Sequence, residues 1–215
     1  MGPKTPAILG SQANAAGVKP RVLVSVTNKT GLEQLHRLHV LGWEIISTGG
    51  TGKELARLAI PFTHIEEITN FPEILDGRVK TLHPHVFAAI LANRDVEAHM
   101  DTIRGLGIAK IDMVIVNLYE FENKPGIENI DVGGPSLIRA AAKNCHSVTV
   151  IVDPEDYDHV FTELEDSKEV WPTTRQRLAT QAFEHTCEYD AAIARWYREQ
   201  LATRTGIPKP ELVAH

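Results

Sequence analysis

The sequence predicts an α/β fold built on a mainly parallel sheet, as one domain over residues 21–200. Two apolar runs, residues 21–26 and 44–47, are each followed by a polar loop containing glycine and then by a helical pattern. Repeated strand–loop–helix units favour parallel strands, because neighbouring parallel strands need a crossover connection that is usually a helix. The chain has 215 residues, of which 43% are hydrophobic, and this is enough for one substantial core.

Net charge, apolar runs and cysteine content exclude several classes of protein. The formal net charge of −6 leaves no basic surface of the kind that nucleic-acid binders carry, although local cations can still hold a small anion. No run approaches the ~20 apolar residues of a membrane-spanning helix. Cys145 and Cys187 form neither a disulfide framework nor a metal-ligand pair of usual spacing. We therefore expect a cytoplasmic protein that binds neither nucleic acid nor membrane.

The two ends of the chain are expected to lie outside the folded domain. Residues 1–20 are rich in Gly, Pro, Ala and Ser and lack the apolar core of a signal peptide, which predicts a flexible leader. Residues 201–215 are predicted as a C-terminal tail.

Hydrophobic periodicity and turn residues define the elements between these ends. The predicted strands are residues 21–26, 44–47, 62–65, 111–116 and 147–152. The predicted helices are residues 32–41, 52–58, 96–104, 135–143, 154–165 and 173–200. Polar loops are predicted at residues 27–31, 48–51 and 77–85.

The first two of these loops follow strands and precede helices, where unpaired N–H groups and the helix dipole attract anions. Lys29 adds a full positive charge. Hydroxyl groups that could bind phosphate oxygens are present on Ser25, Thr27, Thr48 and Thr51. The alternative is ordinary helix capping by Thr27, Asn28 and Thr51, which needs no ligand. Both interpretations stay open on the sequence alone.

The third loop carries two cations. In an extended chain Arg78 and Lys80 project to the same side, which suits an anionic or carbonyl-bearing ligand; the alternative is a solvated loop. His83 and His85 share this spacing, but no nearby cysteine or acidic pair completes a set of metal ligands. We therefore expect no metal site.

The chain from residue 130 to residue 144 runs from a glycine turn into an alanine-rich helix. Pro135 suits the first helical position and Asn144 suits the end. Gly133 and Gly134 would let the backbone approach a ligand closely, which places Asp131 and Val132 beside it. A buried crossover helix with a tight entry turn is the alternative.

At the end of an earlier strand, Asn117 could bind amide or carbonyl groups, and Tyr119 could donate a hydrogen bond or simply pack.

Taken together, these motifs resemble the IMP cyclohydrolase domain of the bifunctional purine-biosynthesis enzymes over roughly residues 21–199. The motifs are Ser-Val-Thr-Asn-Lys-Thr-Gly (25–31), Ser-Thr-Gly-Gly-Thr (47–51), Phe-Pro-Glu (71–73), Gly-Arg-Val-Lys-Thr-Leu-His-Pro (77–84), Val-Asn-Leu-Tyr (116–119), Ile-Asp-Val-Gly-Gly-Pro (130–135) and Arg-Ala-Ala-Ala-Lys-Asn (139–144). The resemblance implies a methylglyoxal-synthase-like, three-layer α/β/α fold. It also implies closure of formamido-imidazole-carboxamide ribotide (FAICAR) to inosine monophosphate (IMP), the last step of de novo purine biosynthesis, with no cofactor. A homodimer is expected.

The resemblance also implies a role for each motif. The catalytic residues that it implies are Lys80, Tyr119, Asp131 and Lys143. The substrate-binding residues that it implies are Ser25, Thr27, Asn28, Lys29, Thr48, Gly49, Gly50, Thr51, Arg78, Thr81, Asn117, Leu118, Val132 and Gly133. The first two loops would hold the 5′-phosphate, and the later motifs would surround the base. One spacing conflicts with this set, because a straight helix puts Lys143 on the order of 12 Å beyond Pro135 and hence far from Asp131.

Three features depart from the family pattern. Glu120 stands where proline is usual, Cys145 stands where histidine is usual, and the link over residues 121–130 looks shortened. No folate-dependent transformylase domain follows, so either a cut-out domain or a stand-alone cyclohydrolase is expected. Two other functions stay open: a methylglyoxal synthase that acts on a triose phosphate, and a non-catalytic nucleotide-binding regulatory domain.

Overall fold

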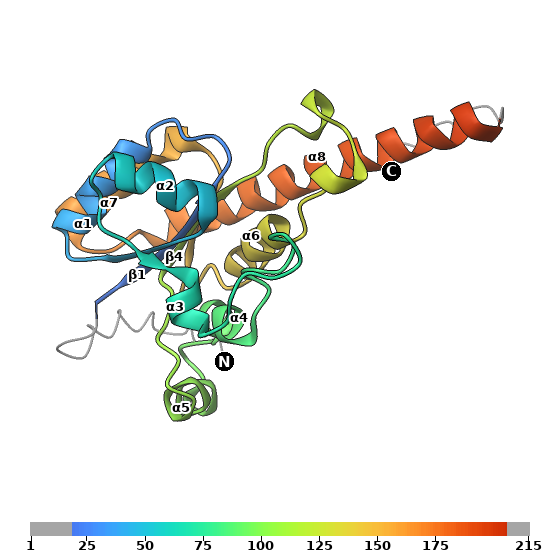
Figure 1. Ribbon diagram of the computed structural model, residues 1–215. Helices are drawn as coiled ribbons and strands as arrows, with labels where there is room; N and C mark the ends of the chain where they lie inside the picture. The colour runs from blue at the N-terminus through green and yellow to red at the C-terminus, as the bar shows by residue number, and fades with distance from the viewer. Residues whose placement is uncertain (1–18, 206–215) are drawn as a thin grey trace, which may run out of the picture.

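A computed structural model describes residues 19–205 and contains one five-stranded parallel sheet (Figure 1). The strands are β1 (Arg21–Val26), β2 (Glu44–Ser47), β3 (Thr63–His64), β4 (Met113–Asn117) and β5 (Thr149–Ile151). Their order in the sheet is β3-β2-β1-β4-β5, and every neighbouring pair is parallel. The predicted α/β class and the predicted parallel pairing are confirmed.

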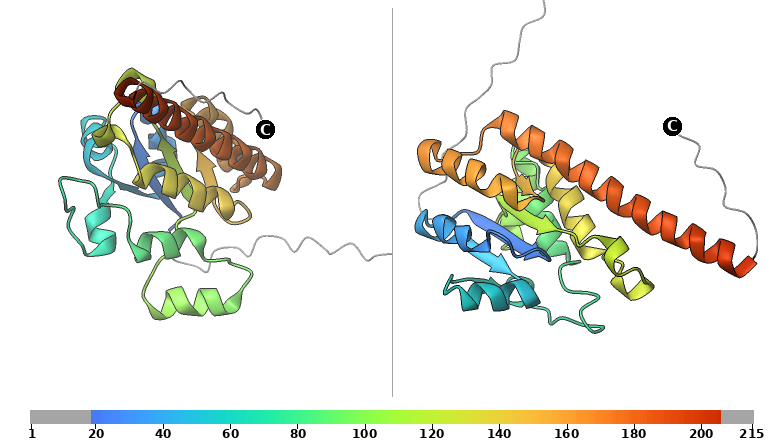
Figure 2. Two further views of the ribbon diagram at one scale, coloured as in Figure 1. Left: turned by 90° about the vertical axis from the view of Figure 1, so that its right-hand side faces the viewer. Right: turned by 90° about the horizontal axis from the view of Figure 1, so that it is seen from above.

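Helices cover both faces of this sheet and give three layers (Figures 1 and 2). The α-helices are α1 (Leu35–Val40), α2 (Gly49–Arg57), α3 (Ile65–Thr69), α4 (Pro84–Leu91), α5 (Glu97–Gly105), α6 (Gly133–Lys143), α7 (Tyr157–Ser167) and α8 (Pro172–Thr205). Short 3₁₀ turns are η1 (Leu32–Gln34), η2 (Phe121–Asn123), η3 (Ile127–Asn129) and η4 (Pro154–Asp156). Helices α1, α2 and α7 lie on one face, and α4, α6 and α8 lie on the other.

The strand order reverses between β1 and β4. The chain moves outward from β1 through β2 to β3, and then crosses back to place β4 on the other side of β1. Open parallel sheets bind ligands in the crevice that such a reversal leaves at the carboxyl ends of the strands. The ends of β1 and β4, at Val26 and Asn117, therefore mark the edge where a site is expected.

The core explains why the strands read as continuous apolar runs. Every residue of β4 is buried, and so are Val22, Leu23 and Val24 of β1. A parallel strand that is covered by helices on both faces has no solvent-facing side, so hydrophobic and polar residues do not alternate along it. Residues on α6, α7 and α8 belong to the same hydrophobic core and cover the two faces of the sheet.

Two helices, α3 and α4, were not predicted, and several predicted boundaries are wrong, two of them at glycines. Helix α2 begins at Gly49, whereas residues 48–51 were predicted as loop. Helix α6 likewise begins at Gly133, so Pro135 is its third residue; proline is accepted there because first-turn N–H groups have no intrahelical partner. Glycine lowers the stability of a helix but can still be part of one. Here both helices begin directly at the sheet edge, with glycine as their first residue.

Other boundaries differ as well. The polar run of residues 77–85 ends in a helix, because the His83 side chain accepts a hydrogen bond from the His85 N–H and caps α4. Helix α8 continues to Thr205, five residues into the predicted tail. The leader over residues 1–18 and the tail over residues 206–215 lie outside the described residues.

Tyr157 provides a stability test of the core. Its side chain is fully buried and its ring stacks on Phe161 at 5.7 Å, but its hydroxyl has no hydrogen-bond partner among residues 19–205. Burial raises the pKa of this hydroxyl, so it stays protonated. We expect Tyr157→Phe to raise the free energy of unfolding by about 1 kcal/mol in urea, because the ring is kept and an unpaired buried polar group is removed. A lower unfolding midpoint would show that the hydroxyl is bonded in solution.

Candidate active site

The first turn of α2 is exposed at the carboxyl edge of the sheet. No side chain caps this helix, although Thr48 precedes it in an extended conformation. Gly49 and Gly50 are both exposed, so their backbone can be approached by a ligand. Free N–H groups and the positive end of the helix dipole together favour an anion at this position.

Lys29 lies on one side of this helix start. Its Nζ donates to the Val26 carbonyl oxygen and to Thr51 Oγ1, the latter at 3.1 Å. Burial lowers the pKa of Lys29, and the nearby Glu54 carboxylate opposes this shift. The ammonium is thus held at the end of β1, beside the first turn of α2.

Lys80 also lies close to this helix start. Its Nζ lies 2.7 Å from Glu73 Oε2, and it lies 3.1 Å from the position that a Cβ on Gly49 would occupy. A cation beside the positive end of a helix is unfavourable unless an anion lies between them. Lys29 and Lys80 therefore both lie near the start of α2, where an anionic ligand is favoured.

Most of the predicted hydroxyl groups form hydrogen bonds within the protein. Thr51 Oγ1 accepts from the Val26 N–H at 3.0 Å and donates to the Val26 oxygen at 3.1 Å. Ser25 Oγ and Thr48 Oγ1 lie 3.2 Å apart and bond to each other. Thr51 and Thr48 are buried, whereas Thr27 is exposed and available. Together Thr51, Ser25 and Thr48 fasten the start of α2 to the end of β1.

Asn117 has a structural role that the sequence did not indicate. Its Oδ1 accepts from the backbone N–H groups of Thr27 and Asn28, at 2.7 and 2.9 Å, and its Nδ2 donates to the Asn28 carbonyl oxygen at 3.1 Å. The side chain is buried and makes these three bonds. Asn117 therefore shapes the loop after β1 across the strand reversal, and its binding of a substrate amide stays a prediction.

Asp131 lies at the start of α6, next to the segment that carries Lys80. Its Oδ1 accepts from the Gly134 N–H at 3.1 Å. A Cβ on Gly134 would lie 2.3 Å from Asp131 Oδ2 and 2.8 Å from Leu118 Cδ2, so only glycine fits there. Thr81 Oγ1 lies 3.0 Å from the Cβ position of Gly133. The structure thus brings Asp131, Gly133, Leu118 and Thr81 together, as predicted.

Tyr119 reaches the loop before Asp131. Its hydroxyl donates to the Asn129 carbonyl oxygen. Burial raises the pKa of Tyr119, and the negative charge of Asp131 raises it further, so the group stays a hydrogen-bond donor at neutral pH. In this arrangement Tyr119 holds the loop and is close to the carboxylate of Asp131.

Two predicted binding residues lie further out. Arg78 pairs with Glu128, and both side chains are largely exposed. Val132 is 60% exposed. These residues border the site at its solvent side.

Lys143 is the predicted residue that the structure does not bring to the site. It ends α6, whose 11 residues put it about 15 Å along the axis from Gly133. Just beyond it, Asn144 bonds to the carbonyl oxygens of Ile90 and Ala92, and the chain then enters β5 at the amino edge of the sheet. Within a single chain, Lys143 therefore lies far from Asp131. The prediction that both residues take part in proton transfer stays a prediction.

Two side chains of α8 touch the site backbone and were missed. The Leu118 N–H donates to His185 Nε2 at 3.2 Å, and the Asp131 N–H donates to Tyr189 Oη at 2.8 Å. Both lie in the predicted helix of residues 173–200 and are four residues apart, so they share one face. In the sequence, only this spacing pointed to the pair, and it could not show which backbone groups the two side chains bind.

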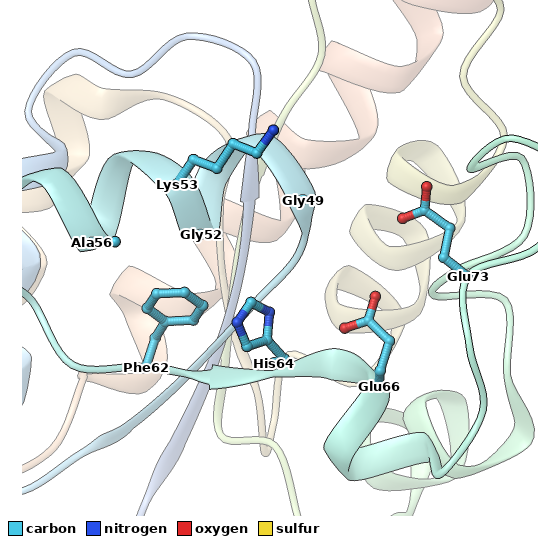
Figure 3. A pocket seen from close by; sticks show the side chains of 8 residues that line it. All are labelled: Gly49, Gly52, Lys53, Ala56, Phe62, His64, Glu66 and Glu73. Atoms are coloured by element: carbon cyan, nitrogen blue, oxygen red, sulfur yellow. The ribbon is translucent and has the colours of Figure 1, made fainter.

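A groove of about 340 Å³ lies beside the site, between α2 and the segment from β3 to Glu73 (Figure 3). Its lining includes Phe62, His64 and the carboxylates of Glu66 and Glu73. Gly49 is the only predicted binding residue that lines it. The carboxylates of Glu66 and Glu73 make their part of the groove less suited to a phosphate than the start of α2.

Residues 19–205 hold no group of three or more His, Cys, Asp or Glu side chains that could bind a metal ion. Within the same residues, no helix is long and apolar enough to cross a membrane.

Comparison with known families fits this geometry. The MGS-like domain model matches residues 31–144, more than half of the chain. The chain belongs to this family. A second model, the AICARFT/IMPCHase bienzyme, matches residues 141–213. The resemblance and the methylglyoxal-synthase-like fold that the motifs predicted are confirmed.

Individual relatives of this MGS-like chain agree with the two family models. The bifunctional purine biosynthesis protein PurH of Listeria monocytogenes is 51% identical over 203 residues, which are 90% of this chain and 39% of that protein. PurH of Acetivibrio thermocellus is 51% identical over 191 residues, which are 84% of this chain and 37% of that protein. The crystal structure of ForH has a TM-score of 0.77 and 33% identity, over 84% of this chain and all of that one. The chain thus spans about two fifths of the length of these PurH relatives.

Proposed function

We propose that this chain is an IMP cyclohydrolase, which closes FAICAR to IMP with loss of water. The observation that carries the proposal is the meeting of two lysines, the start of α2 and Asp131 at one edge of the sheet. A nucleotide would bind with its 5′-phosphate beside Lys29 at the start of α2 and with its base toward Lys80 and Asp131. The PurH relatives, which act in purine biosynthesis by name, support the same substrate class.

The chemistry matches these groups. Ring closure joins the carboxamide nitrogen to the formyl carbon of one molecule, so the reaction depends first on holding the two groups in near contact. The formyl oxygen gains negative charge during the attack, and the Lys80 ammonium would stabilise it. The carboxamide nitrogen and the formamide nitrogen each lose one proton, and the departing formyl oxygen gains two protons and leaves as water. We assign the proton from the carboxamide nitrogen to the Asp131 carboxylate. No electrons are transferred, so the step needs no redox cofactor.

A direct assay tests this function. Purified protein is incubated with FAICAR, and the ultraviolet absorbance change of ring closure is followed. A triose phosphate is tested in parallel. Closure of FAICAR supports the proposal, and activity on the triose phosphate alone would indicate a methylglyoxal synthase instead. Binding of IMP with no turnover of either compound would indicate a regulatory nucleotide-binding domain.

Lys29 tests the position of the phosphate. We expect Lys29→Ala to weaken IMP binding by about 1.5–3 kcal/mol, because it removes a charged hydrogen bond to the phosphate. Lys53→Ala is the matched control, since Lys53 lies on the same helix as Thr51 but is exposed and faces the groove. Titration calorimetry measures both dissociation constants. Equal values for the wild type and Lys29→Ala would place the phosphate elsewhere.

A further inference from the structure

We propose that His185 and Tyr189 of α8 are positioning residues for this site. Each side chain accepts a hydrogen bond from a backbone N–H of a site segment: His185 from Leu118, and Tyr189 from Asp131. Through these bonds α8 sets where the Asp131 carboxylate and the end of β4 lie relative to the substrate. The inference rests on the proposed function, and its test includes a readout that does not depend on that function.

The two residues act as a pair because of their spacing. Positions four apart on a helix lie next to each other, with Cβ atoms roughly 6 Å apart. The two N–H groups that they bind belong to segments 13 residues apart, which approach each other only where β4 ends and α6 begins. Helix α8 packs along α6 and β5, so its inner face is a fixed surface against which both segments are placed (Figure 2).

Tyr189 is the more rigid of the two. Its side chain is 6% exposed, and its ring meets the Phe121 ring edge to face at 6.3 Å. The hydroxyl accepts from the Asp131 N–H and also donates to the Asn129 carbonyl oxygen at 3.4 Å. Tyr119 donates to the same oxygen from the other side. Two tyrosines therefore hold residues 129–131, and the packed ring fixes the direction of the Tyr189 hydroxyl.

His185 can accept a bond through Nε2 only when that nitrogen carries no proton. Burial lowers the pKa of His185, which favours the neutral ring; the carboxylates of Glu188 and Asp153 oppose this shift. Leu118 is the first residue after β4, so it lies beyond the paired register of β1 and β4, which ends at Val26 and Asn117. Because buried N–H groups need a partner, the imidazole also fixes the direction in which the chain leaves the sheet.

The position of the Asp131 carboxylate follows from its backbone. Oδ1 bonds to the Gly134 N–H, and the carboxylate has no free space beside Gly134. A turn of the peptide bond before Asp131 would therefore move the carboxylate out of this position. Misplacement of a reacting group by about 1 Å can cost on the order of 10²-fold in rate. The Tyr189 hydroxyl would then affect turnover without touching the substrate.

The test uses Tyr189→Phe, which removes one oxygen and keeps the packed ring. We expect kcat for FAICAR closure to fall at least ~10-fold, with KM changed less than about 2-fold, because the phosphate position at α2 and Lys29 is untouched. Tyr197→Phe is the matched control, since Tyr197 lies two turns further along α8 and is 48% exposed. His185→Leu should also lower kcat, and His185→Gln should recover part of it, because the Gln oxygen can accept the Leu118 N–H.

The second readout is the backbone amide signal of Asp131 in ¹H–¹⁵N spectra of the full chain. In Tyr189→Phe this signal should shift and its hydrogen should exchange faster, whereas Tyr197→Phe should leave it unchanged. An unchanged Asp131 amide would overturn the proposal. A changed amide with normal kcat would also overturn it, since the bond would then be structural only. If the wild type does not close FAICAR, the proposed function fails, while the amide readout still reports on the bond.

Discussion

Lys80→Ala is expected to lower kcat for FAICAR closure by about 10²–10³-fold, the range found when a donor to a developing oxyanion is removed. The Lys80 ammonium is held by Glu73 at 2.7 Å and lies against Gly49, so it is already in place before substrate binds. Its charge acts on the formyl oxygen mainly when negative charge develops there. Turnover should therefore suffer more than IMP binding.

Stopped-flow absorbance of FAICAR closure, combined with IMP titration, measures the two effects of Lys80→Ala separately. Lys53→Ala serves again as control, because it removes an exposed lysine close to the same helix start. An equal loss in IMP affinity and in kcat/KM, with kcat unchanged, would mean that Lys80 only holds the nucleotide. The phosphate would then be its target and not the formyl oxygen.

Asp131→Asn should lower kcat by at least ~100-fold, in line with the loss of a general base. The substitution is nearly isosteric, and the Asn oxygen can still accept the Gly134 N–H that Asp131 accepts at 3.1 Å. The helix start should therefore keep its shape, and IMP binding should stay measurable. Full activity in Asp131→Asn would remove this residue from the mechanism.

Lys143→Ala should be measured beside Asp131→Asn, because the family resemblance gives both residues a role in proton transfer. Within one chain α6 puts Lys143 about 15 Å along its axis from Gly133, two residues after Asp131. A loss as large as that of Asp131→Asn would show that Lys143 acts on the reaction by a route that the single chain does not display. A small change would remove Lys143 from the proton transfers.

The sequence predicted those parts of the fold that depend on local patterns. The strands at residues 21–26 and 44–47 and the parallel pairing followed from apolar runs and from the helices between them. The start of α2 at Gly49 did not, because a glycine pair favours a loop unless the sheet edge and the preceding strand direct the chain into a helix.

Within the site, the sequence identified charged residues but not their supports. Lys29, Lys80 and Asp131 stood out by residue type and by neighbouring glycines. Asn117 and Tyr189 act through backbone groups that lie 89 or 90 residues away for Asn117 and 58 residues away for Tyr189. No periodicity encodes such a pairing, because it depends on how the elements pack in three dimensions.

The Asn117 side chain has a thermodynamic consequence for ligand binding. Its three bonds to Thr27 and Asn28 hold the loop after β1 without any ligand. Ordering a residue of free backbone costs about 1–2 kcal/mol in conformational entropy. Because folding has already ordered these two residues, a nucleotide that binds beside them does not have to supply that free energy, and more of its contact energy appears as affinity. The buried amide would thus raise the affinity for the proposed nucleotide from a position where it need not touch it.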